Sequence, residues 1–200
     1  MKNTILTSLF LLFFIKTLAQ DFKIPDFNFR YEVEGLNIYL DRLKIKDEQA
    51  LIIKMGVSSH WTEGEYADFL VFENDGNVTF YECFFPNDLQ KKQKIKKQRI
   101  KKSKRKFYWD FLSNSHKRGR FSLKRKKLNI TTKPNGDDTF SRLVISDGRD
   151  YTIKIIQGSK YISYSTYEPK TFIEQKYPGW EERKKFMNLR KDINDLIQKY

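Results

Sequence analysis

The forty residues from Asp88 to Lys127 constrain this chain more than any other stretch, because they carry almost all of its excess charge. The segment holds 18 Lys or Arg against two Asp, a net charge of +16, whereas the whole chain carries +14. The other 160 residues therefore carry a net charge of −2. The basicity is local, and we expect it to form a cationic surface rather than to reflect composition alone.

This basic segment opens with the signals of a helix start. Asn87 and Gln90 follow Pro86 at the spacing of a capping box, and no Gly or Pro interrupts the chain until Gly119. The sequence therefore predicts one long basic helix between two β-rich halves. Like charges one helical turn apart repel each other, so docking of this helix requires an apolar stripe. The predicted stripe contains Ile100, Phe107 and Phe111, widened by Tyr108 and Leu112.

The first half of the chain, up to Pro86, has the patterns of antiparallel strands. Alternation of apolar and polar residues over 26–34 predicts a half-buried strand, and Leu36, Ile38 and Leu40 predict a second. A short apolar run at 50–57 indicates a third. The strongest hairpin signal is the turn at 74–77, which joins strands at 69–72 and 78–81.

The second half predicts three more strands, at 139–145, 150–157 and 160–167, joined by short Gly-containing turns into a meander. A short helix is expected at 171–174, and a final amphipathic helix begins near Trp180. We therefore predict an α+β fold: an antiparallel sheet of about seven or eight strands, a long basic mid-chain helix, and a C-terminal helix packed on the sheet. A closed lipocalin-like barrel is the structural alternative, which the mid-chain helix disfavours.

The first twenty residues have the three-part pattern of a secretory signal peptide. Lys2 precedes an apolar run at 5–15, and Thr17-Leu18-Ala19 offers a small-residue cleavage site. The run is too short to span a bilayer, which needs roughly 20 apolar residues. We expect residues 1–19 to be a signal peptide cleaved after Ala19, and residues 20–200 to be one secreted or periplasmic domain. Lys16 departs from the usual pattern and leaves a retained anchor as the alternative.

Cys83 is the only cysteine, so the chain has no internal disulfide. It lies in the apolar run 80–85, where we expect a buried thiol within a strand.

The signal-like start, the Ala19-Gln20 junction, and the abundance of Lys, Ile, Phe, Tyr and Asn together resemble small secreted proteins of the Bacteroidota. This resemblance covers about twenty residues plus composition. It implies an envelope or extracellular location and no particular activity.

A row of cations attracts phosphates, sulfates and anionic lipid head groups. We therefore predict a non-enzymatic module for an anionic polymer or lipid head group: a glycan, a lipopolysaccharide phosphate or extracellular nucleic acid. A second cluster at 117–127 would extend the surface, and no sequence motif of a nucleic-acid-binding fold is present. The predicted anion-binding residues are Lys91, Lys92, Lys94, Lys97, Arg99, Lys101, Lys104 and Arg105.

The main alternative is a protein-interaction or inhibitor module that uses its sheet face or the aromatic loop around Trp61, with the charge serving solubility only. The sequence predicts no catalytic residue, metal or cofactor, since the usual phosphate-loop, nucleophile-elbow and zinc-protease motifs are missing. A hydrolase would need a pocket that unites His60 or His116 with a carboxylate. The oligomeric state is left open.

Overall fold

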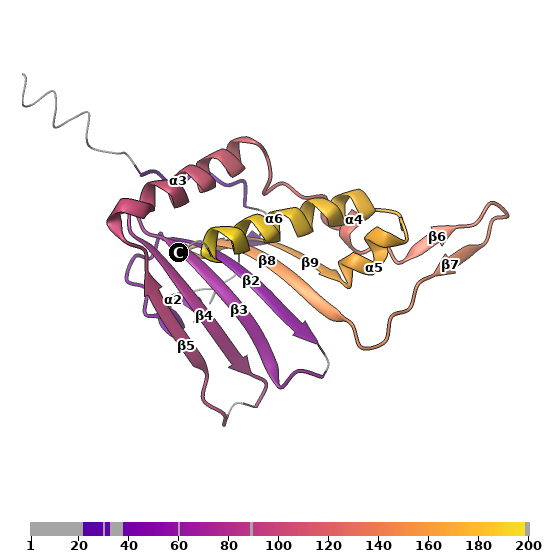
Figure 1. Ribbon diagram of the computed structural model, residues 1–200, viewed down its shortest axis with the longest axis horizontal. Helices are drawn as coiled ribbons and strands as arrows, with labels where there is room; N and C mark the ends of the chain where they lie inside the picture. The colour runs from indigo at the N-terminus through magenta and orange to yellow at the C-terminus, as the bar shows by residue number, and fades with distance from the viewer. Residues whose placement is uncertain (1–21, 30, 33–37, 60, 89, 199–200) are drawn as a thin grey trace, which may run out of the picture.

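The structure is a computed structural model that describes residues 22–198 except 30, 33–37, 60 and 89 (Figure 1). The predicted signal peptide, residues 1–19, lies outside the described residues, as does His60. No helix within the described ranges is long and apolar enough to cross a membrane.

A seven-stranded sheet with strand order β1-β9-β8-β2-β3-β4-β5 forms the centre of the fold, and every neighbouring pair is antiparallel. Its strands are β1 (Tyr31–Glu32), β2 (Leu51–Ser59), β3 (Gly64–Phe72), β4 (Val78–Pro86), β5 (Lys94–Arg99), β8 (Arg149–Gln157) and β9 (Lys160–Tyr167). A separate hairpin consists of β6 (Thr132–Pro134) and β7 (Phe140–Arg142). The helices are α2 (Ile38–Leu43), α3 (Lys102–Lys117), α4 (Arg125–Leu128), α5 (Pro169–Glu174) and α6 (Trp180–Gln198).

The predicted α+β class, the strand number, the mid-chain helix and the C-terminal helix are confirmed. The sheet is open, with β1 and β5 at its two edges, so the barrel alternative is wrong. The hairpin signal at Asp75-Gly76 joins β3 to β4 as predicted, and Gly76 has the positive φ of 82° that such a turn requires.

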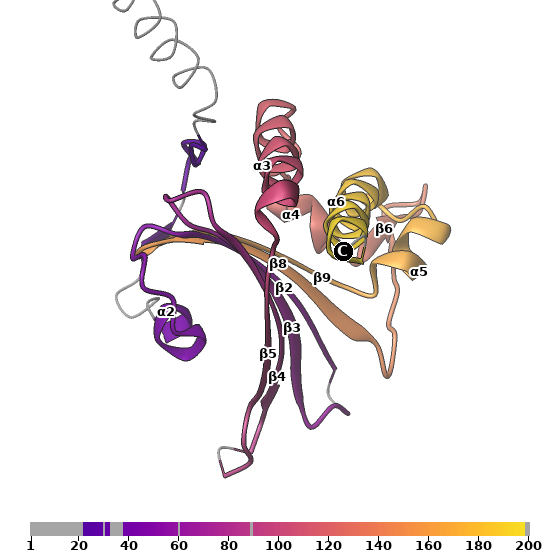
Figure 2. The same cartoon turned by 60° about the vertical axis from the view of Figure 1, so that its left-hand side comes forward.

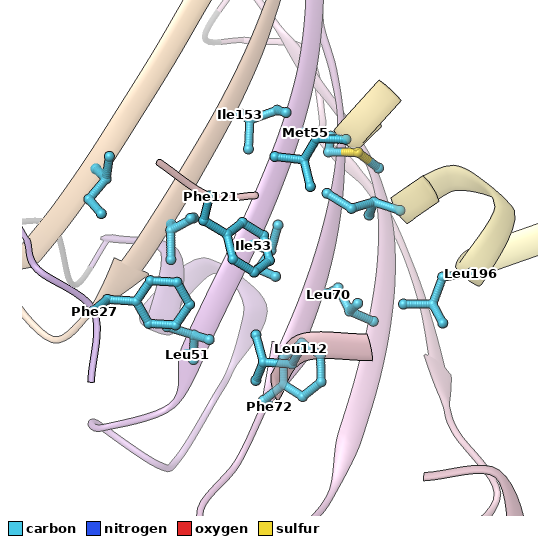
Figure 3. Close-up of a cluster of buried hydrophobic side chains, with 14 of the residues drawn as sticks. Phe27, Leu51, Ile53, Met55, Leu70, Phe72, Leu112, Phe121, Ile153 and Leu196 are labelled. Carbon is cyan, nitrogen blue, oxygen red and sulfur yellow. The ribbon is translucent and has the colours of Figure 1, made fainter. Parts of the chain in front are cut away.

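Helices α3, α4 and α6 lie on one face of the sheet, and α2 lies on the other (Figure 2). Because side chains alternate along β2, Leu51, Ile53 and Met55 point into the core between the sheet and helices α3, α4 and α6. Leu112 of α3 and Leu196 of α6 meet them there (Figure 3). A second cluster on the opposite face includes Leu40 and Leu43 of α2, with Ile52, Phe69, Val71, Tyr81 and Cys83 of the sheet.

Three predictions for the strands are wrong. Among the described residues of the predicted strand (26–29, 31 and 32), only Tyr31 and Glu32 pair with β9. Phe27 is instead buried against the rings of His116 and Phe121. The apolar residues near 38–40 begin helix α2, because Leu40 and Leu43 at helical spacing cover one face of the sheet. The strand β7 pairs with β6 rather than β8, so the predicted three-stranded meander reduces to the hairpin β8–β9.

The long basic helix is also shorter than predicted, because α3 begins only at Lys102 and residues 94–99 form the edge strand β5. In a helix, the lysines of this run would repel each other one turn apart. In the strand, neighbouring lysines point to opposite faces. There Lys96 lies 3.4 Å from a carboxylate oxygen of Glu82, and Lys97 lies 5.3 Å from the centre of the Tyr81 ring.

The docking face of α3 is rotated relative to the predicted stripe. Tyr108 and Leu112 are buried as predicted, whereas Phe107 is 42% exposed. Trp109, which the predicted stripe omits, is 5% exposed and donates an indole hydrogen bond of 3.2 Å to the Gly76 carbonyl. Burial of this large side chain against the β3–β4 turn decides which face of the helix points inward.

Candidate anion-binding surfaces

The eight predicted anion-binding residues lie along one boundary of the molecule, which we call the basic edge: residues 91–105, comprising the approach to β5, β5 itself and the first turn of α3 (Figure 1). Their side chains are exposed except at positions 104 and 105, which are half-buried. The structure therefore brings these residues together, on a strand and a helix start rather than on one helix.

The register of β5 divides its cations between the two faces of the sheet. Lys97 and Arg99 lie opposite Tyr81 and Thr79, on the face that α2 partly covers, whereas Lys94 lies on the helix-bearing face. A ligand on the basic edge would meet cations on both sides of the strand, which differs from the single row that a helix would present.

Parts of the basic edge are already paired. Lys91 lies 3.0 Å from Glu63, and Lys96 pairs with the carboxylate of Glu82. Lys106, which follows the basic edge, pairs with the carboxylate of Asp110. All three ion pairs are exposed, so each contributes little to stability and can exchange for an external anion. Lysines on an edge strand also discourage edge-to-edge association of sheets, which gives the charge on β5 a structural role of its own.

A second cationic surface is a cavity of about 370 Å³ between α4, β6, the segment after α5 and the start of α6. We call it the lysine pocket. Two of its lysines belong to the predicted cluster at 117–127, and three come from later in the chain. Its lining includes Lys124, Lys127, Lys133, Lys176 and Lys185, together with Trp180, Pro134 and Pro178.

The lysine pocket is built on buried polar contacts. The carboxylate of Glu182, which is 4% exposed, accepts a 2.7 Å hydrogen bond from the Lys124 backbone N–H and lies 3.4 Å from the Lys185 ammonium. Gly179 has φ +83°, and a Cβ there would stand 2.0 Å from the Lys127 carbonyl oxygen. The start of α6 therefore packs directly against α4.

Arg183 of α6 connects several of the segments around the lysine pocket through its buried side chain. Its side chain is 1% exposed, donates to the carbonyls of Ile130 (2.7 Å) and Pro178 (2.9 Å), and lies 4.3 Å from the centre of the Phe172 ring. Burial lowers the pKa of Arg183 to about 10. These contacts tie α5, α6 and the segment before β6 together, so the pocket walls belong to the packed body.

The charge of the lysine pocket is strongly positive. Five lysines face two carboxylates, Glu181 and Glu182, and Glu182 is already engaged by Lys124 and Lys185. Among the residues that the structure describes, no ion pair holds the ammonium groups of Lys124, Lys127, Lys133 or Lys176. Sequence reasoning missed Lys133, Lys176 and Lys185, because they lie in three separate segments and no local pattern shows that these segments meet.

Three other side chains singled out in the sequence, His116, Cys83 and Trp61, make contacts that hold the fold together. The ring of His116 packs on Phe27, with Nε2 3.0 Å from the Asp26 carbonyl oxygen. Cys83 is buried in β4 as predicted, and burial is the largest cause that raises the pKa of its thiol to about 12. Trp61 is 77% exposed, and its indole donates a 2.7 Å hydrogen bond to Asp147.

Neither the lysine pocket nor a larger cavity of about 610 Å³ is lined by His116. The larger cavity lies between the N-terminal segment, where Phe27, Phe29 and Tyr31 line it, and the β8–β9 turn. In the described part of the chain, no group of three or more His, Cys, Asp or Glu residues is arranged to hold a metal ion.

A scan against models of protein families found no match to this chain, and a search of curated proteins found no relative.

Proposed function

We propose that this protein is an exported, non-enzymatic module that binds an anionic polymer or lipid head group through its basic edge, with residues 117–127 contributing. The observation that carries the proposal is the way the +16 segment folds. Its apolar side chains, such as Trp109 and Leu112, enter the core, while its cations stay on an edge strand and the outer side of a helix.

The extended form of β5 suits a polymeric ligand. Lys97 and Arg99 lie two residues apart on one face, which places their Cα atoms roughly 7 Å apart. Neighbouring charged groups of a sulfated glycan, a lipopolysaccharide core or a nucleic acid can engage such cations together. Binding of this kind releases counterions and therefore weakens steeply as salt rises.

The first test is binding of residues 20–200 to immobilised heparin, DNA and lipopolysaccharide across a salt series. The proposal expects one ligand to bind much more tightly than the other two, with a steep loss of affinity as salt increases. Equal weak binding to all three that disappears near physiological salt would reject the proposal, because the charge would then act only generically.

A charge-matched pair of variants separates the basic edge from net charge. The test variant replaces Lys94, Lys97, Lys101 and Lys104 with Gln, and the control replaces four exposed lysines elsewhere, Lys23, Lys46, Lys170 and Lys191. Both proteins lose the same charge. The test variant should lose polymer binding and keep its circular dichroism spectrum, while the control should keep both. Equal affinities for the two variants would contradict a role for the basic edge.

The second candidate is a protein-interaction module, which the exposed side chain of Tyr66 beside a half-buried Phe84 favours. Tyr66 is 61% exposed and its ring centre lies 4.7 Å from that of Phe84, on strands β3 and β4. Exposed aromatic side chains are enriched in protein interfaces. This candidate predicts that none of the three polyanions binds specifically and that a Tyr66→Ser change alters association with a protein partner.

A further inference from the structure

The lysine pocket is a defined cavity that shares no residue with the basic edge, although Lys124 and Lys127 belong to the 117–127 cluster. Binding of a small ligand inside this cavity goes beyond the proposed polymer binding. Its lysines come from α4, β6, the segment after α5, and α6, and they converge only in the folded protein. The backbone N–H groups of Trp180, Glu182 and Arg183 are already bonded, to the carbonyls of Tyr177 and Gly179. The attraction for an anion therefore comes from the lysine side chains.

The type of cation in the pocket indicates the type of anion. Lysines line it and no arginine does, among the residues that the structure describes there. Arginine binds carboxylates and phosphates through a two-pronged contact, whereas the lysine ammonium acts as a compact point charge. Several point charges around one cavity can approach the tetrahedral oxygens of a phosphate or sulfate group from different sides.

The remaining walls indicate that the anion is attached to a ring. Trp180 is half-buried at the start of α6, and Pro134 and Pro178 flank the same cavity. These side chains offer flat apolar surface beside the cations, and the C–H groups of a sugar ring pack on such surfaces through dispersion. A volume of about 370 Å³ lies at the small end of ligand pockets, which suits a unit of one or two rings.

Part of the pocket is fixed before any ligand arrives. Glu182 is buried and holds both the Lys124 backbone and the Lys185 ammonium, while Arg183 anchors the floor through two carbonyls. The remaining lysines, Lys127, Lys133 and Lys176, are exposed and form no ion pair within the described residues. The preformed frame lowers the ordering cost of binding, and the exposed cations supply the attraction for an anion.

From these observations we propose that the lysine pocket binds a sugar unit that carries a phosphate or sulfate ester. Lys127, Lys133 and Lys176 would contact the ester oxygens, Trp180 would pack against the ring, and Glu182 would act as a positioning residue for Lys124 and Lys185.

The test is titration of residues 20–200, which contain every described element, with glucose 6-phosphate and glucose 6-sulfate. Glucose, inorganic phosphate and adenosine monophosphate serve as comparison ligands. Occupancy is followed by calorimetry and by the NMR signal of the Trp180 indole, assigned with a Trp180→Phe variant. At least one of the two sugar esters should bind roughly tenfold or more tightly than glucose and inorganic phosphate. Preference for the phosphate or the sulfate ester would distinguish a phosphorylated from a sulfated sugar source.

The variant Lys127→Gln/Lys133→Gln removes two exposed cations, and we expect it to keep its fold and lose roughly tenfold in affinity for the sugar ester. The basic-edge variant described above should bind the ester like the wild type, so failure of the polymer proposal would leave this test unaffected. Three results would overturn the inference: equal ester binding by the double variant, inorganic phosphate binding as tightly as the esters, or tighter binding of adenosine monophosphate than of either ester.

Discussion

Replacing Asp68 with Asn should stabilise the protein at neutral pH and have less effect in acid. Asp68 on β3 lies directly opposite Glu82 on β4, a cross-strand pair of like charge. Burial, assisted by the Glu82 charge, raises the pKa of Asp68 from 3.8 to about 6, while the guanidinium of Arg190 opposes the shift. The ionised form of Asp68 therefore has a cost in the folded protein that a neutral amide avoids.

The sign of the effect follows from proton binding. Between about pH 4 and pH 6, folded Asp68 holds a proton that the unfolded chain releases, so the free energy of unfolding falls as pH rises through this window. A shift to about 6 corresponds to at most about 3 kcal/mol. Because Asp68 is only partly buried, solvent screening reduces the expected cost to about 1–2 kcal/mol.

The assay is urea unfolding of the wild type and of Asp68→Asn at about pH 4 and about pH 7.5, since comparison at each pH cancels the titration of all other groups. The stability advantage of the variant should grow by about 1 kcal/mol or more at the higher pH. Asp195→Asn, which removes an exposed carboxylate on α6, is the control and should show no such growth. An Asp68→Asn advantage that stays constant with pH would refute the reasoning.

Three further predictions concern stability and reactivity. Glu65→Gln removes the carboxylate 2.7 Å from the buried ammonium of Lys54 and should lower the free energy of unfolding in urea by about 1–3 kcal/mol; a loss below about 0.5 kcal/mol would contradict this. Leu112→Ala should cost about 2–5 kcal/mol and Phe107→Ala less than about 1 kcal/mol, whereas equal losses in thermal or urea unfolding would contradict the observed docking face of α3. Cys83 should react with a thiol reagent slowly in the native protein and rapidly in urea, and fast native labelling would contradict its burial.

The two basic surfaces differ in what local sequence can reveal. The basic edge is visible in the sequence because its cations are clustered within fifteen residues, 91–105. Their placement on a strand follows from pairing with Glu82 and Tyr81 on β4. The lysine pocket has no comparable signal. Lys133 and Lys185 lie more than fifty residues apart in the chain and line one cavity only in the folded protein.

The sequence by itself determined the elements whose own residues suffice to specify them. The Asp75-Gly76 turn selects a hairpin, alternation specifies β8 and β9, and the apolar stripe of α6 marks a helix with one buried face. Such signals are local, because each depends on residues within one or two turns of chain.

Only the tertiary structure decided the elements for which local preferences conflict. The lysine run 94–99 has no strand pattern, but it completes the sheet edge beside β4, where alternation separates its charges. Trp109 sets the rotation of α3 because a carbonyl from a distant turn accepts its indole N–H. The lysine pocket likewise depends on hydrogen bonds that Glu182 and Arg183 of α6 form with Lys124, Ile130 and Pro178. Contacts between residues far apart in sequence contribute the free energy that settles each of these choices, and no local pattern encodes them.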